Sequence, residues 1–121
     1  MIAAALASLA LIQALPPHIE QGGWDYIGKS DEVYMFAREF TGQSSTVKGW
    51  VRFEMRNSVN EGQSVRVLYE YDCAGGRQRA LESTAFSDPN LLRPGPTERG
   101  FEWTYVGPDT LNEAGLRYFC R

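Results

Sequence analysis

Short segments in which hydrophobic and polar residues alternate follow one another along most of the chain. This alternation is typical of β-strands, because successive side chains of a strand point to opposite faces of the sheet. Glycine, proline and small polar residues separate the segments and predict turns or loops, of which residues 87–100 form the longest. The expected strands cover residues 24–29, 32–40, 46–56, 65–73, 77–86 and 101–106.

The clearest of these strands covers residues 46–56. Its two faces carry different side chains: Val47, Val51, Phe53 and Met55 on one, and Lys48, Trp50, Arg52 and Glu54 on the other. We expect the first face to be buried and the second to contact water. The following strand alternates in the same way and has one face formed by Val65, Val67, Tyr69, Tyr71 and Cys73.

The hydrophobic period changes near the C-terminus. Residues 110–119 carry apolar side chains at helical spacing, and Thr110 and Glu113 have the spacing of a capping box. The sequence therefore predicts a short C-terminal helix over residues 110–119.

The two cysteines lie at the end of an expected strand and at the end of the expected helix. Two cysteines in an exported chain usually pair, and a Cys73–Cys120 disulfide would hold the helix against the face that carries Tyr69 and Tyr71. A redox-active pair is the alternative, which the absence of a Cys-x-x-Cys motif disfavours. The predicted fold class is α+β, mainly β: a single antiparallel meander sheet of about six strands with the helix packed on one face.

The N-terminal residues are apolar and uncharged, as in the central region of a secretory signal. We expect residues 1–14 to form a signal peptide that is cleaved after Ala14. The first residues lack the usual lysine or arginine, so a different start, or an N-terminal core helix in place of a signal, remains an alternative. Residues 15–23 are rich in helix and strand breakers and are expected to form a loosely ordered linker before a domain over residues 24–121.

Composition narrows the classes of function. The formal net charge of −3 argues against nucleic-acid binding, which usually requires a basic excess. One histidine and two cysteines do not assemble the usual zinc sites, and we expect neither a metal nor a cofactor. The apolar N-terminal segment is too short to cross a bilayer, so we expect no integral membrane span in the mature chain.

Catalytic groups are sparse in this sequence. The single histidine, His18, lies in the expected linker and is poorly placed to act as the base of a catalytic triad. Glu54, Glu70 and Glu82 could share a sheet face and provide paired carboxylates for a small hydrolase. The favoured interpretation is that they form cross-strand pairs with the arginines that alternate with them.

Trp50 is the more informative residue, because alternation places it beside arginines on the face that is expected to contact water. Exposed tryptophan and arginine are common anchors of binding surfaces. Trp50, Arg52 and Arg66 are therefore the candidate ligand-binding residues. The alternative is that another strand edge or the N-terminal linker covers Trp50.

The order of several motifs resembles the surface-adhesin protein E-like family. The resemblance covers residues 24–120 and rests on Trp24, Trp50-Val51-Arg52, Tyr69-Glu70-Tyr71-Asp72-Cys73 followed by Arg77-Gln78-Arg79, Trp103-x-x-Val106-x-Pro108, and Cys120. It implies an antiparallel sheet with a C-terminal helix and a disulfide, in an envelope or surface protein. Named members bind host extracellular-matrix and serum proteins, and haem binding has been associated with the group. This chain lacks the lipoprotein cysteine of the named adhesin, so periplasmic residence is an alternative to surface display.

These observations favour an exported, non-enzymatic binding protein of the bacterial envelope that engages a protein or a small ligand. The first alternative is a structural or accessory protein of a periplasmic complex. A small hydrolase is the weaker alternative. The expected location is the periplasm or the cell surface.

Overall fold

A computed structural model describes residues 15–56 and 62–121. The predicted signal peptide and part of the predicted loop at 57–64 lie outside these residues, so their predictions stay untested.

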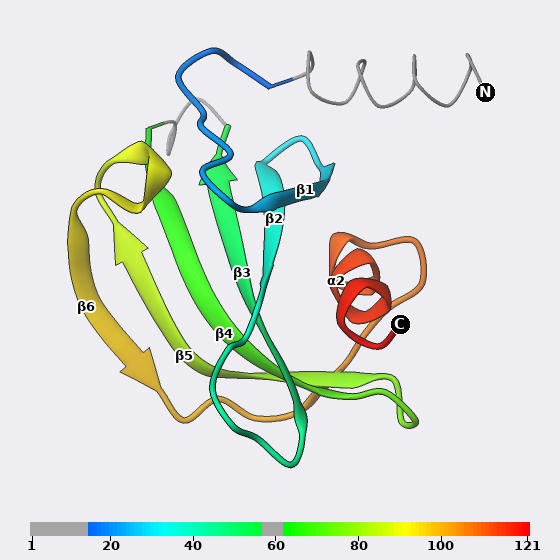
Figure 1. Ribbon diagram of the computed structural model, residues 1–121. Coiled ribbons are helices and arrows are strands. Elements are labelled where there is room, and N and C mark those ends of the chain that lie inside the picture. Colours follow the sequence, from blue (N-terminus) through cyan, green and yellow to red (C-terminus); the bar gives the residue numbers. More distant parts are fainter. Residues whose placement is uncertain (1–14, 57–61) are drawn as a thin grey trace.

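Six antiparallel strands form one sheet, in which their order is the same as their order along the chain (Figure 1). They are β1 (Asp25–Lys29), β2 (Val33–Glu39), β3 (Val47–Met55), β4 (Ser64–Asp72), β5 (Arg77–Phe86) and β6 (Pro94–Arg99). A short strand, β7 (Thr104–Tyr105), pairs with the part of β5 that β6 does not cover. The predicted meander of about six antiparallel strands is therefore confirmed.

The sixth strand is not the one that the sequence predicts. β6 lies within residues 87–100, which we expected to be a loop, and the expected strand at 101–106 shrinks to the two residues of β7. All residues of β6 are exposed, and they include Pro94 and Pro96. Because proline cannot donate to a neighbouring strand, it is found mainly in edge strands, and β6 occupies the edge of the sheet.

The C-terminal helix, α2 (Leu111–Phe119), begins at the predicted cap. The Thr110 side chain accepts a hydrogen bond from the backbone N–H of Glu113, and the Glu113 carboxylate accepts one from the N–H of Asp109. The first contact satisfies an N–H group of the first turn that has no partner within the helix, and the second ties the preceding residue to that turn.

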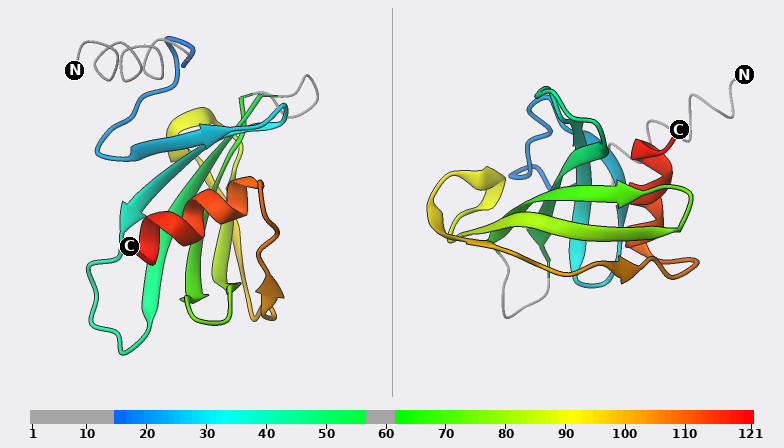
Figure 2. Two further views of the ribbon diagram at one scale, coloured as in Figure 1. Left: turned by 90° about the vertical axis from the view of Figure 1, so that its right-hand side faces the viewer. Right: turned by 90° about the horizontal axis from the view of Figure 1, so that it is seen from below.

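α2 packs across one side of the sheet, which we call the helix face (Figure 2). The core between helix and sheet consists of Met35, Ala37, Val51, Tyr71 and Phe119. The Cys73–Cys120 disulfide joins the end of β4 to the end of α2, with the two Cα atoms 5.7 Å apart. The predicted position of the helix, on the face that carries Tyr69 and Tyr71, is confirmed.

The other side of the sheet, which we call the second face, is only partly in contact with water. Arg52 and Glu54, which we expected on a solvated face, are 2% and 0% exposed. Residues 15–24 fold back over this face and bury Ile19 and Trp24 against Phe36. Residues 15–23, which we expected to form a loosely ordered linker, thus supply apolar side chains to a second small core.

Candidate ligand-binding site

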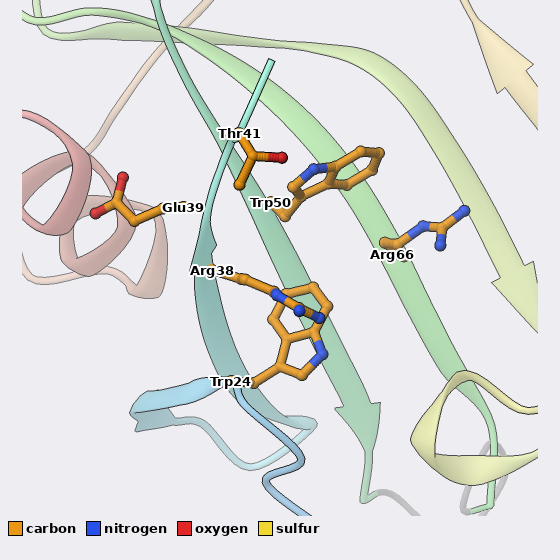
Figure 3. Close-up of a pocket in the computed structure, with 6 residues that line it drawn as sticks. All are labelled: Trp24, Arg38, Glu39, Thr41, Trp50 and Arg66. Atoms are coloured by element: carbon orange, nitrogen blue, oxygen red, sulfur yellow. The ribbon is translucent and has the colours of Figure 1, made fainter.

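A pocket of about 280 Å³ opens on the second face of the sheet. Its walls come from the end of the N-terminal segment, the C-terminal end of β2, and the middle of β3 and β4, as Figure 3 shows. The lining residues are Trp24, Arg38, Glu39, Thr41, Trp50 and Arg66.

Strand register explains why these side chains meet. Arg38 on β2 is paired with Trp50 on β3, so the two side chains lie side by side on the same face. Arg66 on β4 is paired with Arg52 and therefore lies diagonally next to Trp50. In Figure 3 Arg38 lies over Trp24, while Arg66 stands on the strand beyond Trp50 with its guanidinium directed away from Arg38.

Each pocket arginine lies over a tryptophan. The guanidinium of Arg38 is 5.9 Å from the ring centroid of Trp24, and that of Arg66 is 5.1 Å from Trp50. Arg66 also lies 5.7 Å from the ring of Phe86. Such cation–π contacts orient the guanidinium groups without using their hydrogen-bond donors.

Glu39 is the one acidic residue of the pocket wall, but its carboxylate does not face the arginines. It points away from them in Figure 3 and forms an ion pair of 2.9 Å with Arg121 after the end of α2. The pocket is therefore cationic, although the whole chain is acidic.

Arg52 does not line the pocket. Its Nε donates a hydrogen bond of 2.6 Å to Glu54, and its Nη2 donates one of 2.7 Å to Asn90. The guanidinium also lies 4.3 Å from the ring centroid of Phe36. Of the three candidate residues from the sequence, the structure thus brings Trp50 and Arg66 together at the pocket and places Arg52 in the buried layer beside it.

Asn90 ties that buried layer to the N-terminal segment. It lies in the single-turn helix η1 (Pro89–Leu91), where its N–H donates to Glu54. Its side chain donates to the backbone carbonyl of His18 at 2.8 Å and accepts from the N–H of Glu20 at 2.9 Å. Asn90 has φ of 61°, a left-handed conformation that asparagine tolerates better than most residues. His18 thus has a structural contact through its backbone.

The three candidate catalytic carboxylates share the second face, as expected, but each has a basic partner. Glu54 pairs with Arg52 at 2.6 Å, Glu70 with Arg79 at 2.6 Å, and Glu82 with Arg99 at 3.6 Å. A hydrogen bond from the Thr46 hydroxyl, together with Arg79, holds the pKa of Glu70 below its ordinary value. A lowered pKa does not suit the general acid of a hydrolase, which needs a raised one.

A second pocket of about 360 Å³ lies where the beginning of β3 pairs with the end of β4, beside Trp103 and the disulfide. Arg77 and Arg79 lie 5.2 and 4.7 Å from the Trp103 ring. Both arginines form ion pairs, Arg77 with Asp72 and Arg79 with Glu70. Their positive charges are therefore already neutralised within the chain, whereas the two arginines of the first pocket have no carboxylate partner among the described residues.

Four pocket residues were not among the candidates from the sequence: Trp24, Arg38, Glu39 and Thr41. Alternation along β2 places Arg38 on the same face as Phe36, but only the register of β2 against β3 brings it next to Trp50. Trp24 reaches the pocket because the N-terminal segment folds back, which no local pattern indicates.

Within residues 15–56 and 62–121, no cluster of histidine, cysteine, aspartate or glutamate is arranged to hold a metal ion. The helices of this described part are all too short or too polar to cross a membrane.

The fold and the site define a small disulfide-bonded β-sheet domain with an open pocket of tryptophan and arginine. The chain belongs to the surface-adhesin protein E family, whose family model matches residues 24–121. The resemblance seen in the sequence is thereby confirmed. The chain matches no curated protein and no solved structure. Membership in a family of surface adhesins indicates an adhesin-like binding protein, and together with the disulfide it indicates export to the envelope.

Proposed function

We propose that this chain is a non-enzymatic binding protein of the bacterial envelope that engages a protein or a small ligand through the pocket between Trp24 and Trp50. The observation that carries the proposal is the composition of that pocket, where two tryptophans meet two arginines that no described carboxylate neutralises. Tryptophan and arginine are the residues most enriched at the energetic centres of binding sites.

The position of the pocket also favours this assignment. α2 covers the helix face, so a ligand has access to the sheet mainly from the second face. The pocket walls stand on β2, β3 and β4, which have extensive paired registers, and a rigid support lowers the entropy cost of binding.

The assay of choice is binding to a panel of immobilised extracellular-matrix and serum proteins, with the mature domain in solution. We expect Trp50→Ala to lower the affinity for the bound panel members by at least about tenfold, as for a typical hot-spot tryptophan. Trp103→Ala is the matched control, because Trp103 lines the second pocket, which shares no lining residue with the first. Denaturation curves of both variants verify folding. Unchanged binding by a folded Trp50→Ala variant would remove the pocket from the proposal.

An accessory role in an envelope complex is the second candidate function, and the exposed edge of the sheet favours it. In the described part of the chain no strand pairs with the outer edge of β6, which therefore has backbone groups free to pair with another protein. Proteolysis of intact cells, followed by fractionation, separates the two roles. Surface digestion supports the adhesin-like role, whereas protection in the periplasm supports the accessory role.

A further inference from the structure

We propose that the pocket between Trp24 and Trp50 accepts a carboxylate group, which Arg66 binds as its missing acidic partner. The proposal rests on the proposed function, since it names the chemistry of the ligand for the same pocket. The probes are small dicarboxylates and glutamate-containing peptides.

The arginines of this pocket differ from the other arginines of the chain in their partners. The chain has ten arginines. Eight of them contact a carboxylate or a backbone carbonyl: Arg52, Arg56, Arg77, Arg79, Arg93, Arg99, Arg117 and Arg121. Among the described residues, Arg38 and Arg66 alone have no such partner, and both line the same pocket.

Arg66 has a hydrogen-bond donor that no acceptor of the described structure satisfies. Its Nε is buried and has no hydrogen-bond partner in the described structure. An unpaired buried donor costs free energy that a partner can recover, and the cost is larger for a charged group. The aromatic rings of Trp50 and Phe86 hold the guanidinium in place, so its donors are oriented before any ligand arrives.

The neighbours of Arg66 in the sheet do not supply that acceptor. Arg66 is paired with Arg52 on β3 and with Thr84 on β5. The two nearest acidic residues in register, Glu54 and Glu82, form ion pairs with Arg52 and Arg99. A carboxylate from a ligand could therefore form with Arg66 the kind of ion pair that Arg52, Arg79 and Arg99 form within the chain.

The size of the pocket limits what can enter. A volume of about 280 Å³ is at the lower end of ligand pockets and suits a side chain or a small acid. The planar fork of an arginine matches the two oxygens of a carboxylate. Trp24 and Trp50 provide apolar walls for the methylene groups that carry the carboxylate.

The three tryptophans allow a direct test by ¹⁹F NMR. With 5-fluorotryptophan in the mature domain, each of Trp24, Trp50 and Trp103 gives one resonance, which Trp→Phe variants assign. Succinate is titrated against succinamide, and acetyl-Gly-Glu-Gly-amide against its glutamine counterpart, in buffer without carboxylates. The first pair represents a free small acid and the second an acidic side chain of a partner protein.

The expected result is a saturable shift of the Trp24 and Trp50 resonances with one or both acids and little or none with the amides. The Trp103 resonance should not move, because Trp103 lines the second pocket, which shares no lining residue with the first. Arg66→Gln should weaken the interaction by at least about tenfold, in keeping with the loss of a charge-assisted bidentate contact. Arg93→Gln, which changes an exposed arginine away from the pocket, should leave it unchanged. Saturation at a lower concentration of succinate would identify a free small acid as the ligand, and saturation at a lower concentration of the glutamate peptide would identify an acidic side chain of a partner protein.

Arg66 is half-buried, so its substitution could also disturb folding. A second pair of variants, at an exposed position, tests the same proposal without changing Arg66. Thr41 is exposed on the pocket rim, so Thr41→Glu and Thr41→Gln differ only in charge there. Thr41→Glu should weaken carboxylate binding more than Thr41→Gln does, because only the glutamate adds a negative charge to the pocket rim. Equal shifts with acids and amides, movement of Trp103, or full affinity in Arg66→Gln would overturn the carboxylate assignment. The proposed function fails separately, when Trp50→Ala retains binding to the panel.

Discussion

Beside the candidate site, Arg52 and Glu54 form a buried ion pair that the rest of the domain depends on. Both side chains are almost inaccessible to water, and Asn90 satisfies further atoms of each. Breaking such a pair on one side leaves an uncompensated buried charge, which costs more than the pair itself contributes. The pair therefore fixes how β3, η1 and the N-terminal segment fit together.

Glu54→Gln should lower the free energy of unfolding by about 3 kcal/mol, because the guanidinium of Arg52 stays buried without its anion. Glu82→Gln is the matched control, since its partner Arg99 is 70% exposed and the pair should contribute less than about 1 kcal/mol. Urea denaturation measures both values. Equal losses in the two variants would contradict the structural role given to the Arg52–Glu54 pair.

Glu70 should make stability depend on acidity. Its contacts with Thr46 and Arg79 lower its pKa in the folded state, so they stabilise the fold above the unfolded pKa. This contribution is lost as the pH falls through the lower, folded-state pKa. Thr46→Val should cost about 1 kcal/mol at neutral pH, and this cost should shrink in acid as the pH falls through the lowered folded-state pKa of Glu70, where the carboxyl group becomes protonated.

Thr104→Val is the control for that comparison, because the Thr104 hydroxyl donates to a backbone carbonyl, which does not titrate in this range. Its effect on stability should be independent of pH. A Thr46→Val penalty that is the same in acid and at neutral pH would show that the Thr46 hydroxyl does not act through the Glu70 charge.

At the scale of elements, the contact between α2 and the sheet depends on a glycine. The ring of Phe119 lies on Gly49 of β3 and stacks against Tyr71 at a centroid distance of 5.2 Å. A Cβ atom at position 49 would lie 2.1 Å from the Phe119 ring. The helix can therefore approach the sheet this closely only because residue 49 has no side chain.

Gly49→Ala should lower the free energy of unfolding by about 1–3 kcal/mol, as for other overpacked cores. Gly107→Ala is the matched control, because its Cβ would make an ordinary contact of 3.5 Å with Thr110. Chemical denaturation compares the two, and amide exchange shows whether α2 loosens. A neutral Gly49→Ala variant would mean that the helix packs differently from the structure described.

Local signals predicted most of the elements. Alternation located β2 to β5 to within a few residues, and the Thr110–Glu113 spacing located the start of α2. β6 was missed because an exposed edge strand with two prolines has no apolar alternation. The burial of the second face was missed because the segment that covers it, residues 15–24, is held there by contacts distant in sequence. One of these is the hydrogen bond from Glu20 to Asn90, which are 70 residues apart. For the same reason only two of the six pocket-lining residues, Trp50 and Arg66, could be predicted.

At the scale of the whole molecule, the disulfide determines which face of the sheet remains accessible. It links residues 47 positions apart and holds α2 over the helix face. For a domain of this size the hydrophobic core leaves little surplus stability. The covalent link therefore matters both for stability and for keeping the helix face covered while the second face binds.

Replacing both cysteines, Cys73→Ser with Cys120→Ser, should lower the free energy of unfolding by about 4 kcal/mol, because the unfolded chain gains the freedom of an open loop. Guanidinium denaturation of this variant and of the oxidised wild type gives the difference. The single variants, which leave one free thiol, should lose a similar amount. A loss below about 1 kcal/mol would show that core packing alone holds the helix in place.

The most direct test of the account is site-specific photo-crosslinking of the domain to the matrix or serum protein that it binds most tightly in the panel. A benzophenone side chain is placed at Thr41, on the rim of the pocket, or at Asn112, on the exposed surface of α2. If the second face is the binding face, the domain with the probe at Thr41 forms a covalent adduct, and the domain with the probe at Asn112 does not. An adduct from Asn112 with none from Thr41 would place the partner on the helix side and contradict the account.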